Sequence, residues 1–193
     1  MYDERNLIYM KKNHQKTVEQ SKAWLMQAFF RQLAQMPYDA ITITGIAQQA
    51  QLSRRTFYRH FTTKDDLLQQ YLEILFDRYV DLLLQKNIAR HEDTLQCFFT
   101  FWQHYAPELR LLQKQGLFEQ VLHMANQWYP TMYRKLQVPW HCHCNEEEMR
   151  YVSAFGAGGY FNILSLWIQR GCPETPAEMV TIVKTLLEAL SVS

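Results

Sequence analysis

The chain has 193 residues, of which 48% are hydrophobic and 20% charged. This length can bury a full core, and this composition excludes an intrinsically disordered chain. The formal net charge is only +1, yet residues 1–64 carry ten Lys and Arg against four Asp and Glu, while residues 65–193 carry ten against fifteen. The resulting charges of +6 and −5 indicate a localised basic surface that suits nucleic acid.

The cysteines and the apolar runs indicate the cellular compartment in which the protein is expected. Cys97, Cys142, Cys144 and Cys172 form no framework typical of a small secreted domain, and the first residues do not resemble a signal peptide. No run approaches the roughly 18 consecutive apolar residues that a membrane-spanning helix needs. We therefore expect a cytoplasmic, reduced protein that does not enter a membrane.

The first third of the chain predicts an arm followed by a helix. Residues 1–15 are polar and mixed in charge, and we expect a poorly ordered arm. Apolar residues then recur at helical spacing from Thr17 to Met36, and Pro37 ends the pattern. This helix would support the segment that follows it.

Residues 41–68 predict two short helices joined by a tight turn and then the start of a long helix. Thr42 or Thr44 can cap the first short helix, and Ser53 can cap the second. Within the second, Phe57 and Phe61 are one turn apart and would point inward. Six polar residues remain on its outer faces: Arg54, Arg55, Thr56, Tyr58, Arg59 and His60.

A short helix of this kind can enter the major groove of DNA, which is about 12 Å wide. Its arginines could pair with guanine or clamp phosphates, and its Thr, Tyr and His side chains could reach phosphate oxygens. Lys64, at the start of the next helix, could reach a nearby phosphate. The alternative from composition alone is an ordinary solvated basic helix.

The order of residues in this segment is more specific than its composition. The string S-R-R-T-F-Y-R-H-F-T-T-K-D-D-L-L (residues 53–68), preceded by I-T-x-x-x-I-A-x-x-A, closely resembles the TetR family of bacterial helix-turn-helix repressors over roughly residues 17–85. The chain departs from the family at Gln51, where a turn glycine is common, and at Thr44 and Gly45, where basic and acidic residues are common. The resemblance implies DNA contacts at Thr44, Arg54, Arg55, Thr56, Tyr58, Arg59, His60 and Lys64.

The rest of the chain predicts further helices. The long helix after Thr63 is amphipathic and resembles the family's connecting helix. Further apolar patterns, with one interruption at Pro130, place the remaining helices at Asp93–His104, Pro107–Gln115, Leu117–Leu136, Glu146–Arg170 and Ala177–Leu190.

Aromatic residues gather in this second part of the chain. They favour a well-filled helical core, or a largely apolar ligand cavity whose hydroxyl and indole groups supply polar specificity. The cavity hypothesis names Trp102, Phe118, Trp128, Tyr133 and Tyr160.

The loop His141-Cys142-His143-Cys144 holds residue types that zinc and copper prefer. Neighbouring side chains point in opposite directions, however, and no second ligand pair follows, so a polar surface loop is the simpler interpretation and we expect no metal or other cofactor. No phosphate-binding loop, nucleophile elbow or paired-histidine metal helix is present, and we expect no enzymatic activity.

The string F-G-A-G-G-Y-F-N-I-L-S-L-W-I-Q-R-G-C-P-E-T-P-A-E-M (residues 155–179) resembles a C-terminal type within the TetR family that includes relatives of the dihydroxyacetone-kinase regulator. This resemblance implies that the last two helices form an isologous four-helix dimer interface, and packing within one subunit is the alternative.

Together these patterns predict an all-α fold with a three-helix N-terminal head, holding the helix-turn-helix, and a larger helical C-terminal body for ligand binding and dimerisation. We expect a DNA-binding domain at residues 1–62 and the second domain at 63–193. The function expected is a homodimeric regulator on a palindromic double-stranded DNA operator, a repressor released by an unknown small-molecule effector. The alternative is an activator or co-regulator gated by a protein partner.

Overall fold

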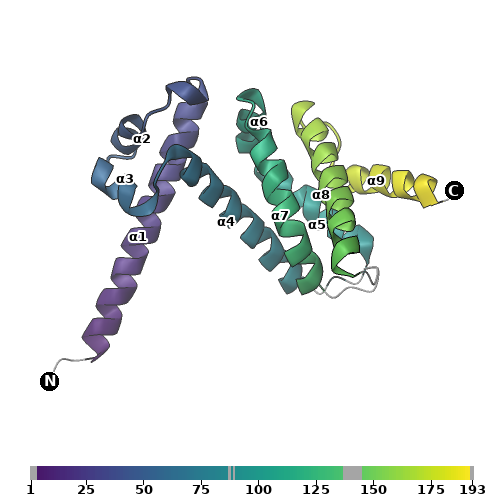
Figure 1. Ribbon diagram of the computed structural model, residues 1–193, viewed down its shortest axis with the longest axis horizontal. Helices are drawn as coiled ribbons and strands as arrows, with labels where there is room; N and C mark the ends of the chain where they lie inside the picture. The colour runs from purple at the N-terminus through teal and green to yellow at the C-terminus, as the bar shows by residue number, and fades with distance from the viewer. Residues whose placement is uncertain (1–3, 87, 89, 137–144, 192–193) are drawn as a thin grey trace. The chain divides into compact units, whose positions relative to one another are not determined.

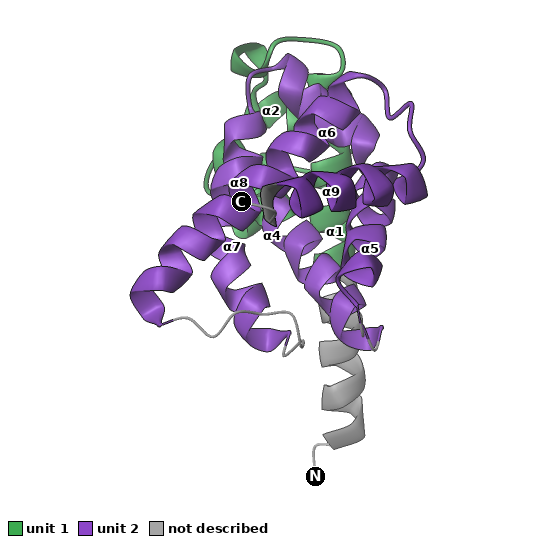
Figure 2. Ribbon diagram, turned by 90° about the vertical axis from the view of Figure 1, so that its right-hand side faces the viewer, with its two compact units in different colours: residues 1–71 green, residues 72–193 purple. Residues whose placement is uncertain are grey.

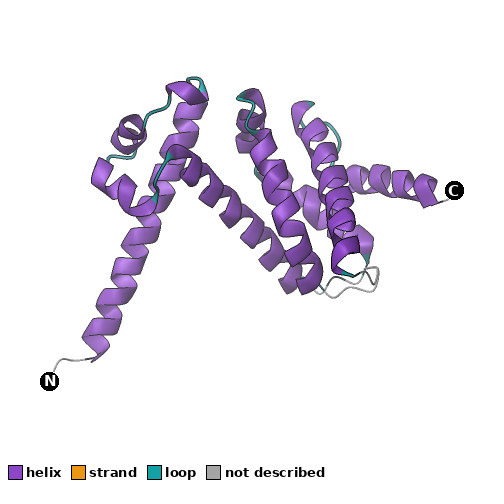
Figure 3. Ribbon diagram, in the orientation of Figure 1, coloured by secondary structure: helices purple, strands orange, loops and turns teal. Residues whose placement is uncertain are grey.

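The computed structural model describes residues 4–86, 88, 90–136 and 145–191, and of residues 4–17 and 190–191 it describes the backbone alone. Every regular element in these ranges is a helix, as Figure 3 shows, so the all-α prediction is confirmed. In chain order (Figure 1) they are α1 Glu4–Leu33, η1 Tyr38–Ala40, α2 Ile43–Gln49, α3 Arg54–His60, α4 Lys64–Gln85, α5 His91–His104, α6 Ala106–Lys114, α7 Phe118–Lys135, α8 Glu146–Gln169 and α9 Pro176–Ser191.

The chain divides into two compact units, coloured separately in Figure 2: the head, Met1–Tyr71, and the body, Leu72–Ser193. The division falls inside α4, beyond the boundary expected after residue 62. The reason is packing, because the first two turns of α4 bury Leu67 and Leu68 completely within the head.

The head is built on α1, which begins at Glu4, so the prediction of a poorly ordered arm over residues 1–15 is wrong for the part from residue 4 onward. Residues 4–36 contain neither Gly nor Pro, and nothing in that stretch interrupts a helix. The head core is formed by apolar side chains from α1 to α4, each less than 2% exposed: Leu25, Phe29, Leu33, Ile46, Phe57, Phe61, Leu67 and Leu68.

The turn between α2 and α3 is a Schellman motif. Leu52 N donates to Ala47 O (2.9 Å) and Gln51 N donates to Gln48 O (3.0 Å). Gln51 therefore takes the left-handed backbone, with φ of 57°, at the position where the family often has glycine. A side chain in this conformation costs about 1 kcal/mol or more.

The departure at Gly45 has a packing reason. A Cβ at this position would lie 2.8 Å from Nε2 of Gln32, which is buried on α1. A larger residue here would require the Gln32 side chain to shift, and the cap of α2 is supplied by Thr42, whose hydroxyl accepts from Gly45 N (3.1 Å). Of the two caps considered, Thr42 is the one used.

In the body, α7 and α8 pack side by side, and one glycine permits their close approach. A Cβ at Gly156 would lie 2.3 Å from the phenol group of Tyr129, whereas nothing lies within 4 Å of a Cβ at Gly158 or Gly159. The predicted interruption at Pro130 is wrong, because α7 is continuous through it. Proline removes one backbone donor, and the tertiary packing of α7 outweighs that loss.

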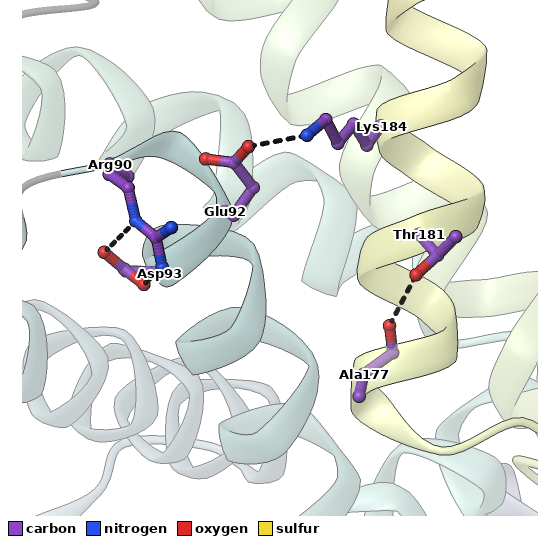
Figure 4. A network of polar contacts seen from close by, with 6 residues as sticks. All are labelled: Arg90, Glu92, Asp93, Ala177, Thr181 and Lys184. Carbon is purple, nitrogen blue, oxygen red and sulfur yellow. Dashed lines mark hydrogen bonds and ion pairs between the residues drawn. The ribbon is translucent and has the colours of Figure 1, made fainter.

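An ion pair joins α5 and α9, which also pack on each other. Glu92 Oε1 lies 3.0 Å from Lys184 Nζ, and Arg90 pairs with Asp93 at 3.0 Å within the first turn of α5 (Figure 4). The N-terminus of α8 is closed by a capping box, in which Asn145 accepts from Glu148 N (2.9 Å) and Glu148 accepts from Asn145 N (2.9 Å). These contacts fix the helix starts of the body.

Candidate nucleic-acid interface and ligand cavity

Helix α3 is anchored from behind and exposed in front. Ser53 Oγ accepts from Thr56 N (3.0 Å) and caps the helix as predicted. Phe57 and Phe61 are buried, with ring centroids 5.4 Å apart. This anchoring leaves the side chains of Arg54 and Arg55 exposed at the N-terminal end of the helix, which is the end that contacts base edges in helix-turn-helix proteins.

The other predicted contacts on α2 and α3 are distributed around this end. Tyr58 is 51% exposed, and the Arg54 guanidinium lies 5.9 Å from its ring centroid. Thr44 and Arg59 are exposed, while Thr56 is half-buried, with its hydroxyl 2.9 Å from that of Ser53. The arrangement offers a basic, hydrogen-bonding surface on one short helix.

Lys64 lies at the first position of α4, and its ammonium is already engaged. It donates to the backbone oxygens of Tyr38 (2.7 Å) and Ile41 (3.2 Å) and lies 4.2 Å from the Tyr38 ring centroid. An ammonium has three donors, so one remains for a phosphate. The sequence prediction missed the structural role, which ties α4 to η1.

His60 faces α1. Ser21 Oγ lies 2.9 Å from Val18 O, to which it can donate, and 2.8 Å from His60 Nε2. When Ser21 donates to Val18 O, Nε2 is the donor in the contact with Ser21, and Nδ1 of the neutral ring is an acceptor that cannot donate to a phosphate. Burial lowers the pKa of His60, with smaller contributions from Arg59 and Lys22. We therefore interpret His60 as a group that positions α3 on α1, which differs from the predicted DNA contact.

The body contains a cavity of about 270 Å³ between α4, α5, α7 and α8. Of the five residues predicted to form it, Trp128, Tyr133 and Tyr160 line it, whereas Trp102 and Phe118 do not. Trp102 is fully buried behind the wall against Phe76 and Phe161. The wall is formed by Phe76, Tyr79, Val80, Ile88, His91, Thr94, Leu95, Phe98, Ala125, Trp128, Tyr129, Met132, Tyr133, Leu136, Val152, Tyr160 and Phe161.

Most wall residues were not named by the cavity hypothesis, and two contributions among them are informative. Phe76, Tyr79 and Val80 belong to α4, where the apolar stripe predicted only packing; the spacing of Phe76 and Tyr79 on one face was the available signal. His91 begins α5, and nothing in its sequence surroundings marked it.

His91 and Tyr160 form a polar pair in the cavity wall. His91 Nε2 lies 3.0 Å from the Tyr160 hydroxyl. Burial lowers the pKa of His91, partly opposed by the nearby Glu92, and burial raises the pKa of Tyr160. Both side chains are consequently neutral near pH 7.

Within the described ranges no group of three or more His, Cys, Asp or Glu is arranged to hold a metal ion. The loop His141–Cys144 lies outside the described residues. None of the helices described combines the length and apolar character that crossing a membrane requires.

An all-helical chain whose head presents a capped basic helix after a tight turn belongs to the helix-turn-helix class of DNA-binding proteins. The family described as "Bacterial regulatory proteins, tetR family" matches residues 25–71, and the family described as "Transcriptional regulator C-terminal region" matches residues 112–189. The chain is a member of the tetR family and a DNA-binding transcriptional regulator.

Solved structures share the fold at low identity. The dihydroxyacetone kinase operon activator DhaS is 16% identical, with a TM-score of 0.59 over 88% of this chain and 95% of its own. The fatty acid degradation regulator FadR from Bacillus halodurans is 16% identical, with a TM-score of 0.57 over 86% and 93%. Lin0861 from Listeria innocua is 14% identical, with a TM-score of 0.70 over 89% and 91%. The comparison with curated proteins gave no match.

Proposed function

We propose that this protein is a homodimeric, cytoplasmic transcriptional repressor that binds a palindromic DNA operator through α3 and is released by a small ligand in the body cavity. The single observation that carries the proposal is the exposed N-terminal end of α3, where Arg54 and Arg55 extend from a helix anchored by buried Phe57 and Phe61.

The division of labour in the head follows from these positions. Arg54, Arg55 and Thr56 would read base edges, because residues at the start of a recognition helix reach the groove floor. Tyr58 would contact the backbone from its exposed position, and Lys64 would add its remaining donor. Thr44 and Arg59, which are also exposed, would complete the backbone contacts.

The dimer is supported by an apolar stripe on the last two helices. Tyr151 (73% exposed), Phe155 (70%) and Leu166 (57%) fall on one side of α8, because steps of four and eleven residues return to the same face. Ile182 (49%) and Leu186 (47%) continue the apolar surface on α9. A second copy of the chain would cover this surface in an isologous interface.

Ligand control is supported by the continuity of α4. The cavity is lined by Phe76, Tyr79 and Val80 of this helix, and the same helix places Leu67 and Leu68 in the head core. A ligand that shifts α4 would change the spacing of the two heads, and half-sites separated by about 34–36 Å would no longer fit.

Selection of duplexes from a random pool by the purified chain tests DNA recognition. The enriched sequence should be palindromic, and Arg55→Ala should weaken its binding relative to a scrambled duplex by about 1–3 kcal/mol. Arg90→Ala removes the same charge from the body, and it should change neither the affinity for the selected duplex nor the affinity for the scrambled duplex. If no sequence is enriched over bulk duplex, the proposal that the protein is a repressor is wrong.

The dimer has its own test in light scattering. Phe155→Glu should give a monomer, whereas Leu84→Glu, which places the same charge on an exposed apolar residue of α4, should stay dimeric. A dimer that persists in Phe155→Glu would place the interface elsewhere.

A further inference from the structure

Among the described residues, the wall of the body cavity carries no formal charge. Its lining in the described part of the chain contains no Asp, Glu, Lys or Arg, and it is dominated by aromatic and aliphatic side chains. A buried carboxylate or ammonium on a ligand would find no charged partner there, and the cost of burying such a group is large. The wall therefore favours an uncharged molecule.

The His91–Tyr160 pair adds a requirement for hydrogen bonding. Its two groups are 3.0 Å apart, with His91 from the start of α5 and Tyr160 from α8. If Tyr160 donates to His91, its oxygen can accept from a ligand; if His91 donates to Tyr160, the phenol proton is available to a ligand. A hydroxyl group suits both arrangements, because it donates and accepts.

The cavity also limits size and shape. Its volume of about 270 Å³ is below the range of roughly 300–1,000 Å³ typical of drug-sized ligand sites. Phe76, Phe98, Trp128 and Phe161 present aromatic rings in the wall, and Phe76 stacks on Trp128 with centroids 6.3 Å apart and planes inclined by 23°. A flat ring packs well against such aromatic surfaces.

We propose that the cavity binds an uncharged aromatic molecule of about two fused rings that carries a hydroxyl group, and that this hydroxyl is hydrogen-bonded by the His91–Tyr160 pair. The assignment of this molecule as the effector rests on the proposed function, whereas its binding in the body does not. The uncharged lining and the volume of about 270 Å³ disfavour long anionic ligands.

Three probes of equal ring size test the proposal on the full chain: 2-naphthol, naphthalene and 2-naphthoate. Binding is followed at pH 7 through the ¹⁵N-labelled indole signals, with the Trp128 signal assigned by Trp128→Phe and Trp24 in the head as an internal reference. We expect 2-naphthol to shift the Trp128 signal and to bind at least about tenfold more tightly than 2-naphthoate. Tighter binding of the carboxylate, or no shift with any probe, would overturn the proposal.

The hydroxyl contact is tested by the ratio of the 2-naphthol and naphthalene affinities. One hydrogen bond corresponds to a preference of about 3- to 10-fold, which Tyr160→Phe should abolish. Tyr105→Phe removes a hydroxyl outside the cavity and should leave the ratio unchanged. Loss of the ratio in Tyr79→Phe with its retention in Tyr160→Phe would move the polar contact away from the pair. The ratio of the 2-naphthol and naphthalene affinities is first measured on the wild-type protein, which does not depend on any variant folding. Near-UV circular dichroism then verifies the fold of each variant.

These results are separable from the repressor proposal. Absence of probe binding would overturn the cavity assignment while the operator selected from the random pool is still bound. Probe binding that leaves operator affinity unchanged would support the cavity assignment and contradict release by this class of molecule.

Discussion

The head and the body place their candidate sites in different ways. In the head, the residues proposed to read base edges lie within one helix of seven residues, and the same short segment supplies the anchor Phe57 and the cap Ser53. In the body, the cavity takes its wall from four helices, so that His91 and Tyr160 meet although they are 69 residues apart in the chain. A site carried by one helix is local in sequence, and a site enclosed by several depends on tertiary packing.

The largest expected effect is the destabilisation of the head, without the body, by Phe57→Ala. Phe57 is completely buried, and Phe57→Ala should destabilise the head by about 3–5 kcal/mol through the cavity it leaves. Operator binding should be lost, whereas 2-naphthol should still shift the indole signal of Trp128 in the body. Phe118→Ala, at a half-buried position in the body, should leave operator binding intact. Retention of full operator affinity in Phe57→Ala would mean that the anchor is dispensable.

The next effect belongs to the body. A Cβ at Gly156 would lie 2.3 Å from the Tyr129 ring, so Gly156→Ala should destabilise the body by about 1–3 kcal/mol through overpacking. Gly158→Ala is the matched control: nothing lies within 4 Å of its Cβ, and better helix propensity should raise stability by up to about 1 kcal/mol. Thermal unfolding followed by circular dichroism measures both. Equal melting temperatures for the two variants would contradict the close approach of α7 and α8.

The two regions share a response to pH. Burial lowers the pKa of His60 in the head and of His91 in the body. As pH falls below about 6.5, the unfolded chain takes up protons at these positions before the folded chain does, so stability falls until the folded pKa is reached. The melting temperature should therefore drop between pH 7.5 and pH 5.5, and His91→Gln should reduce that drop. An undiminished drop in His91→Gln would assign the response to other groups.

Local signals in the sequence predicted the head better than the body. Ser53, Phe57 and the long helix after Thr63 follow from capping and from helical spacing, which are readable over a few residues. Of the aromatic residues that the cavity hypothesis named, Trp128, Tyr133 and Tyr160 line the cavity, and their role in ligand binding stays a prediction. The hypothesis failed at Trp102 because spacing along one helix does not reveal whether a buried ring faces a void or a neighbouring ring.

Two positions in the head show a second limit. The contacts of Lys64 with the backbone of η1 and of His60 with Ser21 join residues more than twenty positions apart. Their side-chain types suit phosphate binding equally well, so the sequence alone did not separate the two roles. A variant at either position would therefore confound folding with DNA affinity, which is why Arg55 is the better choice.

The smallest expected effect concerns the left-handed backbone at the ends of two helices, where one helix has a glutamine and the other a glycine. Helices α2 and α6 both end in Schellman motifs, but the left-handed residue is Gln51 in the head and Gly116 in the body. Gln51→Gly should stabilise the head by roughly 0.5–1 kcal/mol, because relief of the left-handed side chain exceeds the added entropy of the unfolded chain. Gly116→Gln is the reverse change at a position where nothing lies within 4 Å of a Cβ, and it should destabilise the body by a similar amount. The melting temperature of each variant, compared with that of the wild-type protein, measures the two changes in stability. Destabilisation by Gln51→Gly would mean that the glutamine side chain forms contacts worth more than its backbone strain.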